Sequence, residues 1–101
     1  MKLLEQSLAI LVTSSRHPEY VRQLARSARQ AGKAVKVHFA GTGVHLATSR
    51  MLAYLAGWAE VTVCMDSAAD EAASRLKSDG LLAPASRLVE LVGGCDRYVV
   101  F

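Results

Sequence analysis

Short apolar runs separated by helical patterns constrain the fold of this chain most strongly. Residues 7–13 form a continuous apolar run bounded by polar residues, as in a parallel strand buried on both faces. Further strand-like runs follow at 34–40, 60–64 and 97–101. Strands that alternate with helices through short turns require right-handed crossovers. The sequence therefore predicts an α/β domain of three layers, α/β/α, with helices on both faces of a mostly parallel sheet of four or five strands.

A stretch with helical spacing of apolar residues lies after each of the first three runs and before the last. The expected helices are 18–31, 44–57, 67–77 and a last one that Pro84 opens and the Gly93-Gly94 pair ends. Along 34–40, apolar side chains alternate with Lys36 and His38, which predicts a strand exposed on one face. We expect the chain to close on a buried strand at 97–101.

Composition limits the size and setting of the protein. Its 101 residues, 51% of them hydrophobic, fit a single domain over 1–101. The mean hydropathy of +0.21 suggests that some surface is buried against another subunit. No apolar run approaches the roughly 20 residues that cross a bilayer, and no signal-peptide pattern opens the chain. We therefore expect a cytoplasmic protein without a membrane partner.

Basic residues form a stripe on the first expected helix. Arg22, Arg26, Arg29 and Lys33 fall opposite its apolar face, while the net charge of the chain is only +3. A solvated outer face is the preferred interpretation, and docking of an acidic partner or a phosphate backbone is the alternative. No aromatic residue interleaves with the stripe in this helix, so we do not expect a nucleic-acid partner.

Cys64 occupies the most suggestive position for chemistry. It ends an expected strand, and Asp66 or Ser67 can cap the helix that follows. The positive end of a helix favours a thiolate, whereas a carboxylate such as Asp66 opposes it if it faces the sulfur. An unpaired cysteine can equally be a small buried hydrophobe. Cys95 is remote and completes no C-x-x-C pair, so we expect neither a zinc site nor a disulfide.

Two histidines and a glycine turn are weaker candidates. His17 and His45 fall near strand ends, where either could act as a base toward Cys64, although a loop histidine is usually just exposed. The turn Gly41-Thr42-Gly43 could cradle an anion, but G-x-G-x-x-G is not completed and a tight turn without ligand is preferred. The histidines lack metal-ligand spacing, so no metal and no cofactor are expected.

The strand ends also carry a family resemblance. The first strand ends in Leu-Val-Thr-Ser, the second leads into Gly-Thr-Gly-Val, the third ends in Val-Thr-Val-Cys64, and the chain closes with Cys-Asp-Arg-Tyr-Val-Val-Phe101. In order and spacing, these motifs resemble those of the DsrE/DsrF/TusD-like sulfur-relay proteins, nearly from end to end. The resemblance implies a flavodoxin-like subunit that assembles into trimers or hexamers, with like or unlike subunits.

The resemblance further implies that Cys64 carries persulfide sulfur between donor and acceptor proteins. Relatives have an arginine in the turn after the cysteine, where this chain has acidic residues. Arg75 or a basic residue of another subunit is the candidate to replace its charge, and Ser67 is a further supporting candidate. The alternatives are an assembly subunit in which Cys64 is structural, and a binder of small anions or nucleotides at the Gly41 turn.

Overall fold

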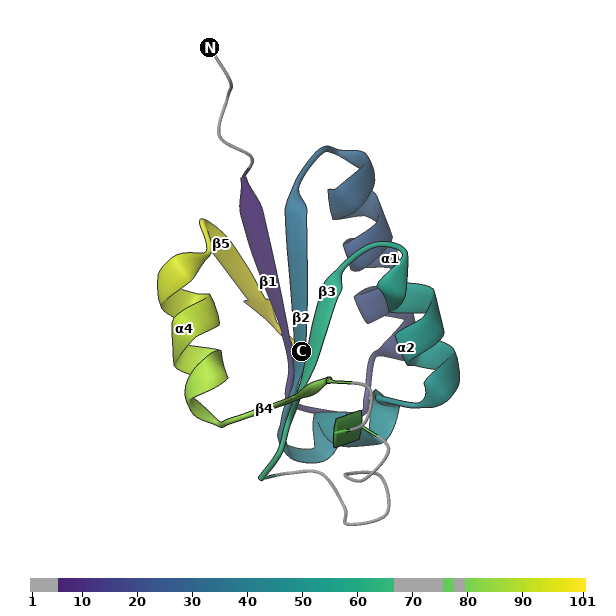
Figure 1. Ribbon diagram of the computed structural model, residues 1–101. Coiled ribbons are helices and arrows are strands. Elements are labelled where there is room, and N and C mark those ends of the chain that lie inside the picture. Colours follow the sequence, from purple (N-terminus) through teal and green to yellow (C-terminus); the bar gives the residue numbers. More distant parts are fainter. Residues whose placement is uncertain (1–5, 67–75, 78–79) are drawn as a thin grey trace.

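The computed structural model describes residues 6–66, 76–77 and 80–101 of the chain (Figure 1). Its elements, in chain order, are β1 (Ser7–Val12), α1 (Pro18–Gln30), β2 (Ala34–Phe39), the 3-10 helix η1 (Gly41–Leu46), α2 (Ser49–Ala56), β3 (Glu60–Cys64), β4 (Leu82–Ala83), α4 (Ser86–Gly94) and β5 (Arg97–Val100). The predicted alternation of strands and helices is therefore confirmed for these residues.

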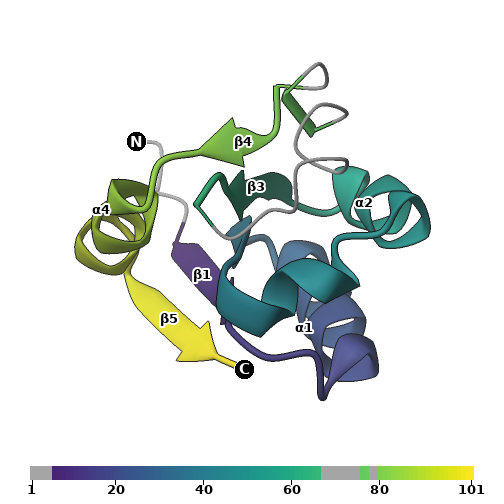
Figure 2. The same ribbon diagram turned by 90° about the horizontal axis from the view of Figure 1, so that it is seen from below.

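All five strands belong to one parallel sheet with the order β4-β3-β2-β1-β5. Helices α1 and α2 lie on one face of this sheet and α4 lies on the other, as the two perpendicular views show (Figures 1 and 2). The carboxyl ends of the strands consequently meet at one edge, at the bottom of Figure 1. The predicted three-layer α/β/α fold is confirmed.

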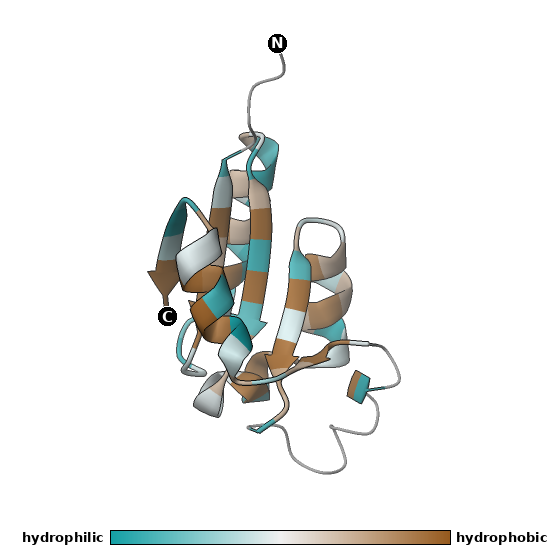
Figure 3. Cartoon of the chain, turned by 60° about the vertical axis from the view of Figure 1, so that its left-hand side comes forward, coloured by the Kyte–Doolittle hydropathy of each residue, from teal (hydrophilic) through white to brown (hydrophobic). Residues whose placement is uncertain are grey.

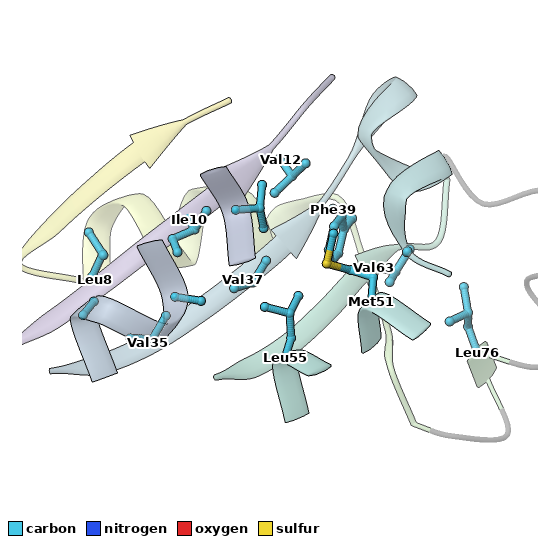
Figure 4. Close-up of a cluster of buried hydrophobic side chains, with 14 residues drawn as sticks. Leu8, Ile10, Val12, Val35, Val37, Phe39, Met51, Leu55, Val63 and Leu76 are labelled. Atoms are coloured by element: carbon cyan, nitrogen blue, oxygen red, sulfur yellow. The ribbon is translucent and has the colours of Figure 1, made fainter. Parts of the chain in front are cut away.

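The larger core fills the space between the sheet and helices α1 and α2 (Figure 4). Alternate residues of three strands point into it, because successive side chains of a strand face opposite ways. The helices close it with their buried faces. Its largest fully buried apolar side chains include Ile10, Phe39, Leu55 and Leu76. Leu76 shows that the connection between β3 and β4 contributes to the core on this face.

The opposite face has a smaller apolar cluster under α4. Ala9 and Leu11 of β1 pack there against Leu91, with Leu88 and Cys95 beside them. Figure 3 looks toward this side and shows polar and apolar residues alternating along the strands behind α4. The polar side chains of β2 and β3 point to this face of the sheet, whereas the valine and phenylalanine side chains of these strands point into the larger core.

The last strand differs from its prediction. β5 is an edge strand next to β1, and most of its residues are exposed, including Tyr98 and Val100. The expected buried strand is wrong because β5 pairs on one side only and α4 covers just part of its face. Asp96 fixes its start: its carboxylate accepts hydrogen bonds from the Ser7 amide (2.7 Å) and hydroxyl (3.1 Å). These bonds lower the Asp96 pKa.

The predicted helix at 44–57 is divided in two. Residues 41–46 form η1, and α2 begins only at Ser49 after the capping residue Thr48, whose hydroxyl accepts a hydrogen bond from the Met51 amide (3.2 Å). A threonine N-cap supplies an acceptor for one of the free amides of the first turn. Continuous helical spacing of apolar residues concealed this break, since both pieces bury residues in the same core.

The last helix also has shifted ends. It begins at Ser86 rather than at Pro84, and it continues through Gly93 and Gly94 instead of stopping at them. A backbone hydrogen bond from the Cys95 amide to the Leu91 carbonyl (3.1 Å) closes its final turn. Leu82 and Ala83, for which the sequence predicted no element, form the short strand β4. Of the predicted helix 67–77, only residues 76 and 77 are described, and both are helical.

No helix in the described ranges is long and apolar enough to span a lipid bilayer.

Candidate functional site

Cys64 lies at the carboxyl edge of the sheet, as predicted, because it is the last residue of β3. It pairs with Ala83 of β4, and the next amide, that of Met65, donates to the Ala83 carbonyl at 2.9 Å. The Cys64 residue is 6% exposed and its thiol is free. Met65 and Asp66, which follow it, are exposed. The cysteine is thus covered, but the residues next to it face solvent.

The described residues of the two connections next to this position lie on opposite faces of the sheet. The connection from β3 to β4 places Leu76 in the core under α1 and α2, whereas the connection from β4 to β5 is α4 on the other face. In open α/β sheets, ligands bind at the carboxyl ends of the strands, where the connections of neighbouring strands go to opposite faces. Cys64 and Ala83 lie side by side at this divergence.

The two candidate base residues do not pair with Cys64. His17 precedes α1 and stacks on Tyr20, with 5.2 Å between ring centroids, two strands away from β3. His45 lies in η1, which packs against β2 and β3, and is exposed. Among the residues that the structure describes, no hydrogen bond links either histidine to Cys64. The other two supporting candidates, Ser67 and Arg75, lie outside the described residues.

The glycine turn has a packing role. A Cβ atom on Gly43 would lie 2.1 Å from the Val12 carbonyl oxygen, so only glycine lets η1 pass this close to β1. The Gly43 amide already donates to the Ala40 carbonyl (3.0 Å), and the Thr42 hydroxyl donates to the Thr13 carbonyl (3.2 Å). The Gly43 amide and the Thr42 hydroxyl therefore both donate to backbone carbonyls of the protein.

His38, which the sequence did not predict as a site residue, lies on the same face of the sheet as Cys64. His38 of β2 pairs with Thr62 of β3, and Cys64 is two residues further along that strand. His38 is 1% exposed, which corrects the prediction that its side of β2 faces solvent. The prediction is wrong because β2 is the central strand and α4 covers this face. The sequence did contain a signal for this placement. Alternate residues of a strand face the same side of a sheet, so pairing of the two strands could have placed His38 and Cys64 on one face.

The polar contacts of His38 are incomplete. Its Nδ1 lies 2.7 Å from the Thr62 hydroxyl oxygen, while its Nε2 is buried and has no hydrogen-bond partner within the described part of the chain. An unsatisfied buried polar atom costs about 1–3 kcal/mol. Burial, and to a smaller extent the charge of Arg87, lower the His38 pKa below its ordinary value of 6.5. We conclude that His38 is neutral at pH 7.

Arg87 brings the charge of α4 to this face of the sheet. Its guanidinium donates to Glu60 of β3 (3.1 Å) and to Glu90 of its own helix (3.2 Å). Both carboxylates are largely exposed, so each ion pair contributes about 0–1 kcal/mol. The pair with Glu60 ties α4 to the amino end of β3. On this face of the sheet, the neutral His38 imidazole lies next to the Thr62 hydroxyl, and Cys64 is two residues further along β3. The Arg87 cation is near the imidazole.

Protonation of His38 should make stability depend on pH. The unfolded chain binds this proton near pH 6.5, whereas the folded state resists it, so the contribution of His38 to stability is complete above pH 6.5. As the pH falls from 6.5 toward the lowered pKa, we expect the free energy of unfolding to drop by up to about 1.4 kcal/mol per pH unit. Urea denaturation between about pH 7.5 and 5.5 measures this slope.

The double variant His38→Leu/Thr62→Val is the matched control for this slope. It replaces both partners of the hydrogen bond with apolar groups of similar size, which is nearly neutral for stability in favourable cases. The variant should lose the part of the slope that His38 causes. An unchanged slope would show that His38 is not the group that titrates.

The described residues contain no group of three or more His, Cys, Asp or Glu side chains that could hold a metal ion. Cys95 is also a free thiol, but it follows α4 at the amino end of β5, on the opposite edge of the sheet from Cys64. No protein-family model matches the chain, and a search of the curated proteins finds no match.

Proposed function

We propose that the protein is a DsrE-like sulfur carrier in which Cys64 accepts sulfane sulfur from one protein and passes it to the thiol of another. The observation that carries this proposal is the position of Cys64, at the carboxyl end of β3 where the connections of β3 and β4 diverge. The resemblance of the strand ends to sulfur-relay proteins points to the same residue. No metal or cofactor enters the proposed reaction.

The proposed step is a thiol exchange without net oxidation. The Cys64 thiolate attacks the outer sulfur of a donor persulfide, a new bond forms between the two sulfurs, and the donor thiolate leaves. In the second step an acceptor thiolate attacks the outer sulfur of the Cys64 persulfide and releases the Cys64 thiolate. One cysteine is sufficient, which fits a chain whose second thiol lies at the other edge of the sheet.

Access to Cys64 is the main structural requirement of this proposal. The strand that pairs beside it, β4, is at the sheet edge and has only two residues. Short edge strands with few hydrogen bonds open at low free-energy cost compared with the central strands. We propose that a donor protein reaches the thiol when the Met65 to Ala83 contact at this edge opens. The exposed Met65 side chain then provides a contact point for that protein.

Sulfur loading is the direct test. After incubation with a small persulfide donor, intact mass spectrometry should show one added sulfur atom on the wild-type chain and none on Cys64→Ser. Cys95→Ser is the matched control and should load like the wild type. A reducing thiol should remove the added sulfur from Cys64. Absence of an adduct on the folded wild type with any persulfide donor would refute the proposal.

A second candidate function is a non-catalytic assembly subunit of the same fold, in which Cys64 is a structural residue. Its burial at 6% exposure favours this alternative. So do the exposed apolar side chains on β5 and α4, which are Val89, Val92, Tyr98 and Val100. Both candidates include assembly into a trimer or hexamer, which light scattering detects. A multimer whose wild-type Cys64 never loads would favour the assembly subunit.

A further inference from the structure

The basic stripe of α1 has neighbours that the helix alone does not reveal. Arg22 donates from Nη1 to the Met51 sulfur of α2 at 3.9 Å, and the Arg26 guanidinium lies over the Trp58 ring, 5.7 Å from its centroid. These contacts place the stripe on the flank of α1 that faces α2. Lys33 leaves the stripe, because its ammonium binds the Gln6 side chain (2.8 Å).

Aromatic side chains of α2 and the turn after it join this stripe. Tyr54 and Trp58 lie one helical turn apart with 6.5 Å between ring centroids. Tyr54 also lines a hollow of about 450 Å³ with Arg22 and Arg50, and Trp58 lines a second hollow of about 360 Å³ that includes Arg29 and Lys36. Each hollow thus contains an aromatic ring, two basic side chains and one acidic side chain, which is Glu19 in the first and Glu60 in the second. We call this surface the α1/α2 track; its members are Arg22, Arg26, Arg29, Arg50, Tyr54 and Trp58.

The charge of the chain is unevenly distributed along the sequence, and the segment that contains the track is strongly basic. Residues 16–58 contain seven lysines and arginines and a single acidic residue, Glu19, which gives a net charge of +6. The whole chain carries only +3, so the remaining residues carry −3. Glu19 is already paired with Arg22. A small overall charge therefore conceals a basic half, and the α1/α2 track contains four of its seven basic residues.

We propose that the α1/α2 track binds single-stranded nucleic acid. Proteins that bind single strands combine a positively charged groove, which follows the phosphates, with aromatic rings on which bases stack. Arginine guanidinium planes also stack on bases, so Arg26 over Trp58 extends the stacking surface rather than blocking it. An acidic protein segment would satisfy the arginines but would make no use of the Tyr54 and Trp58 pair. Both rings are half-buried and pack against the core, and their exposed parts are what favour a nucleic acid.

The track lies on the α1/α2 side of the sheet, and its residues are distinct from those of the Cys64 site. Its proposed ligand therefore does not depend on sulfur loading, and either proposal can fail without the other. Within α1 alone, no aromatic residue interleaves with the basic stripe, which is why the sequence predicted no nucleic-acid partner. The structure supplies the missing aromatic residues from α2, which lies beside α1, and from the turn that follows α2.

Binding can be tested with the full chain and a labelled single-stranded oligothymidylate in low salt. Trp58 is the only tryptophan, so stacking on the track should quench the intrinsic fluorescence as the oligonucleotide binds. Three or four phosphate contacts predict a slope of roughly −2 to −3 for the logarithm of the binding constant against that of salt. A duplex of the same length should bind more weakly, because its bases are not available for stacking.

Matched variants separate the contributions of charge and stacking. Arg26→Ala/Arg50→Ala should weaken binding at least tenfold and reduce the salt slope by about 1.4, whereas Arg97→Ala, an exposed arginine on β5, should change neither by as much. Tyr54→Leu should weaken binding about 5- to 30-fold, and Tyr54→Phe should bind like the wild type. Circular dichroism checks that each variant folds.

Three results would overturn the proposal: no binding of the oligonucleotide by the folded wild type, equal binding of single strand and duplex, or binding that Tyr54→Leu leaves unchanged. In the last case polyglutamate that competes as well as the oligonucleotide would identify the track as a surface for acidic proteins instead.

Discussion

The Gly43→Ala variant is expected to lose about 3 kcal/mol of the free energy of unfolding. The added Cβ would lie 2.1 Å from the carbonyl oxygen and 2.6 Å from the carbonyl carbon of Val12. Both are backbone atoms of β1, which pairs with β2 on one side and β5 on the other, so β1 cannot move away cheaply. The new methyl group must instead push η1 off the edge of the sheet. Urea denaturation measures the loss.

Gly93→Ala is the matched control for this substitution. A Cβ at Gly93, inside α4, meets no atom within 4 Å. Replacing a helical glycine there with alanine should raise the free energy of unfolding by about 0.5–1 kcal/mol, because the unfolded chain loses conformational freedom. The same chemical change should thus have opposite signs at the two positions. Equal changes in the free energy of unfolding for the two variants would contradict the close approach of η1 to β1.

This contrast also explains why glycines are ambiguous in a sequence. For Gly41 to Gly43 the sequence favours a tight turn over an anion site, and Gly93-Gly94 predicts the end of a helix. The first feature serves a close approach between η1 and β1, and the second lies within a helix that a backbone hydrogen bond continues to Cys95. A glycine shows that a side chain is absent, but the reason depends on which atoms lie next to it. Those atoms belong to segments far away in the sequence.

The fold class followed from the sequence because local patterns determine it. The apolar run at the start of the chain forms the buried strand β1, and the β-branched residues before Cys64 form the strand β3. Cys64 ends its strand as predicted. What could not be predicted depends on neighbours across the sheet. Alternation along β2 cannot show that α4 covers His38, and the pattern of α1 cannot show that Arg26 meets Trp58. The histidine on the same face of the sheet as Cys64 and the aromatic residues next to the arginines were missed for the same reason.

Truncation of the central aromatic residue should be the most damaging substitution in the core. Phe39 has no exposed surface, lies on the central strand β2 and shares its cluster with Met51 of α2 and Val63 of β3 (Figure 4). Phe39→Ala removes a whole ring from this closed cluster, and we expect it to cost about 3–5 kcal/mol. Domains of this size have about 5–15 kcal/mol in total, so the variant would be close to unfolding.

Phe39→Leu separates loss of volume from loss of the ring. Leucine keeps most of the apolar volume, so its cost should be well below that of alanine, provided that Met51 repacks against it. Thermal and urea denaturation of both variants measure the difference. Similar costs for alanine and leucine would mean that the shape of the ring, rather than its volume, is what holds α2 against the sheet. A cost below about 1 kcal/mol for alanine would contradict the closed core, because a buried aromatic side chain cannot be removed from dense packing without a large loss.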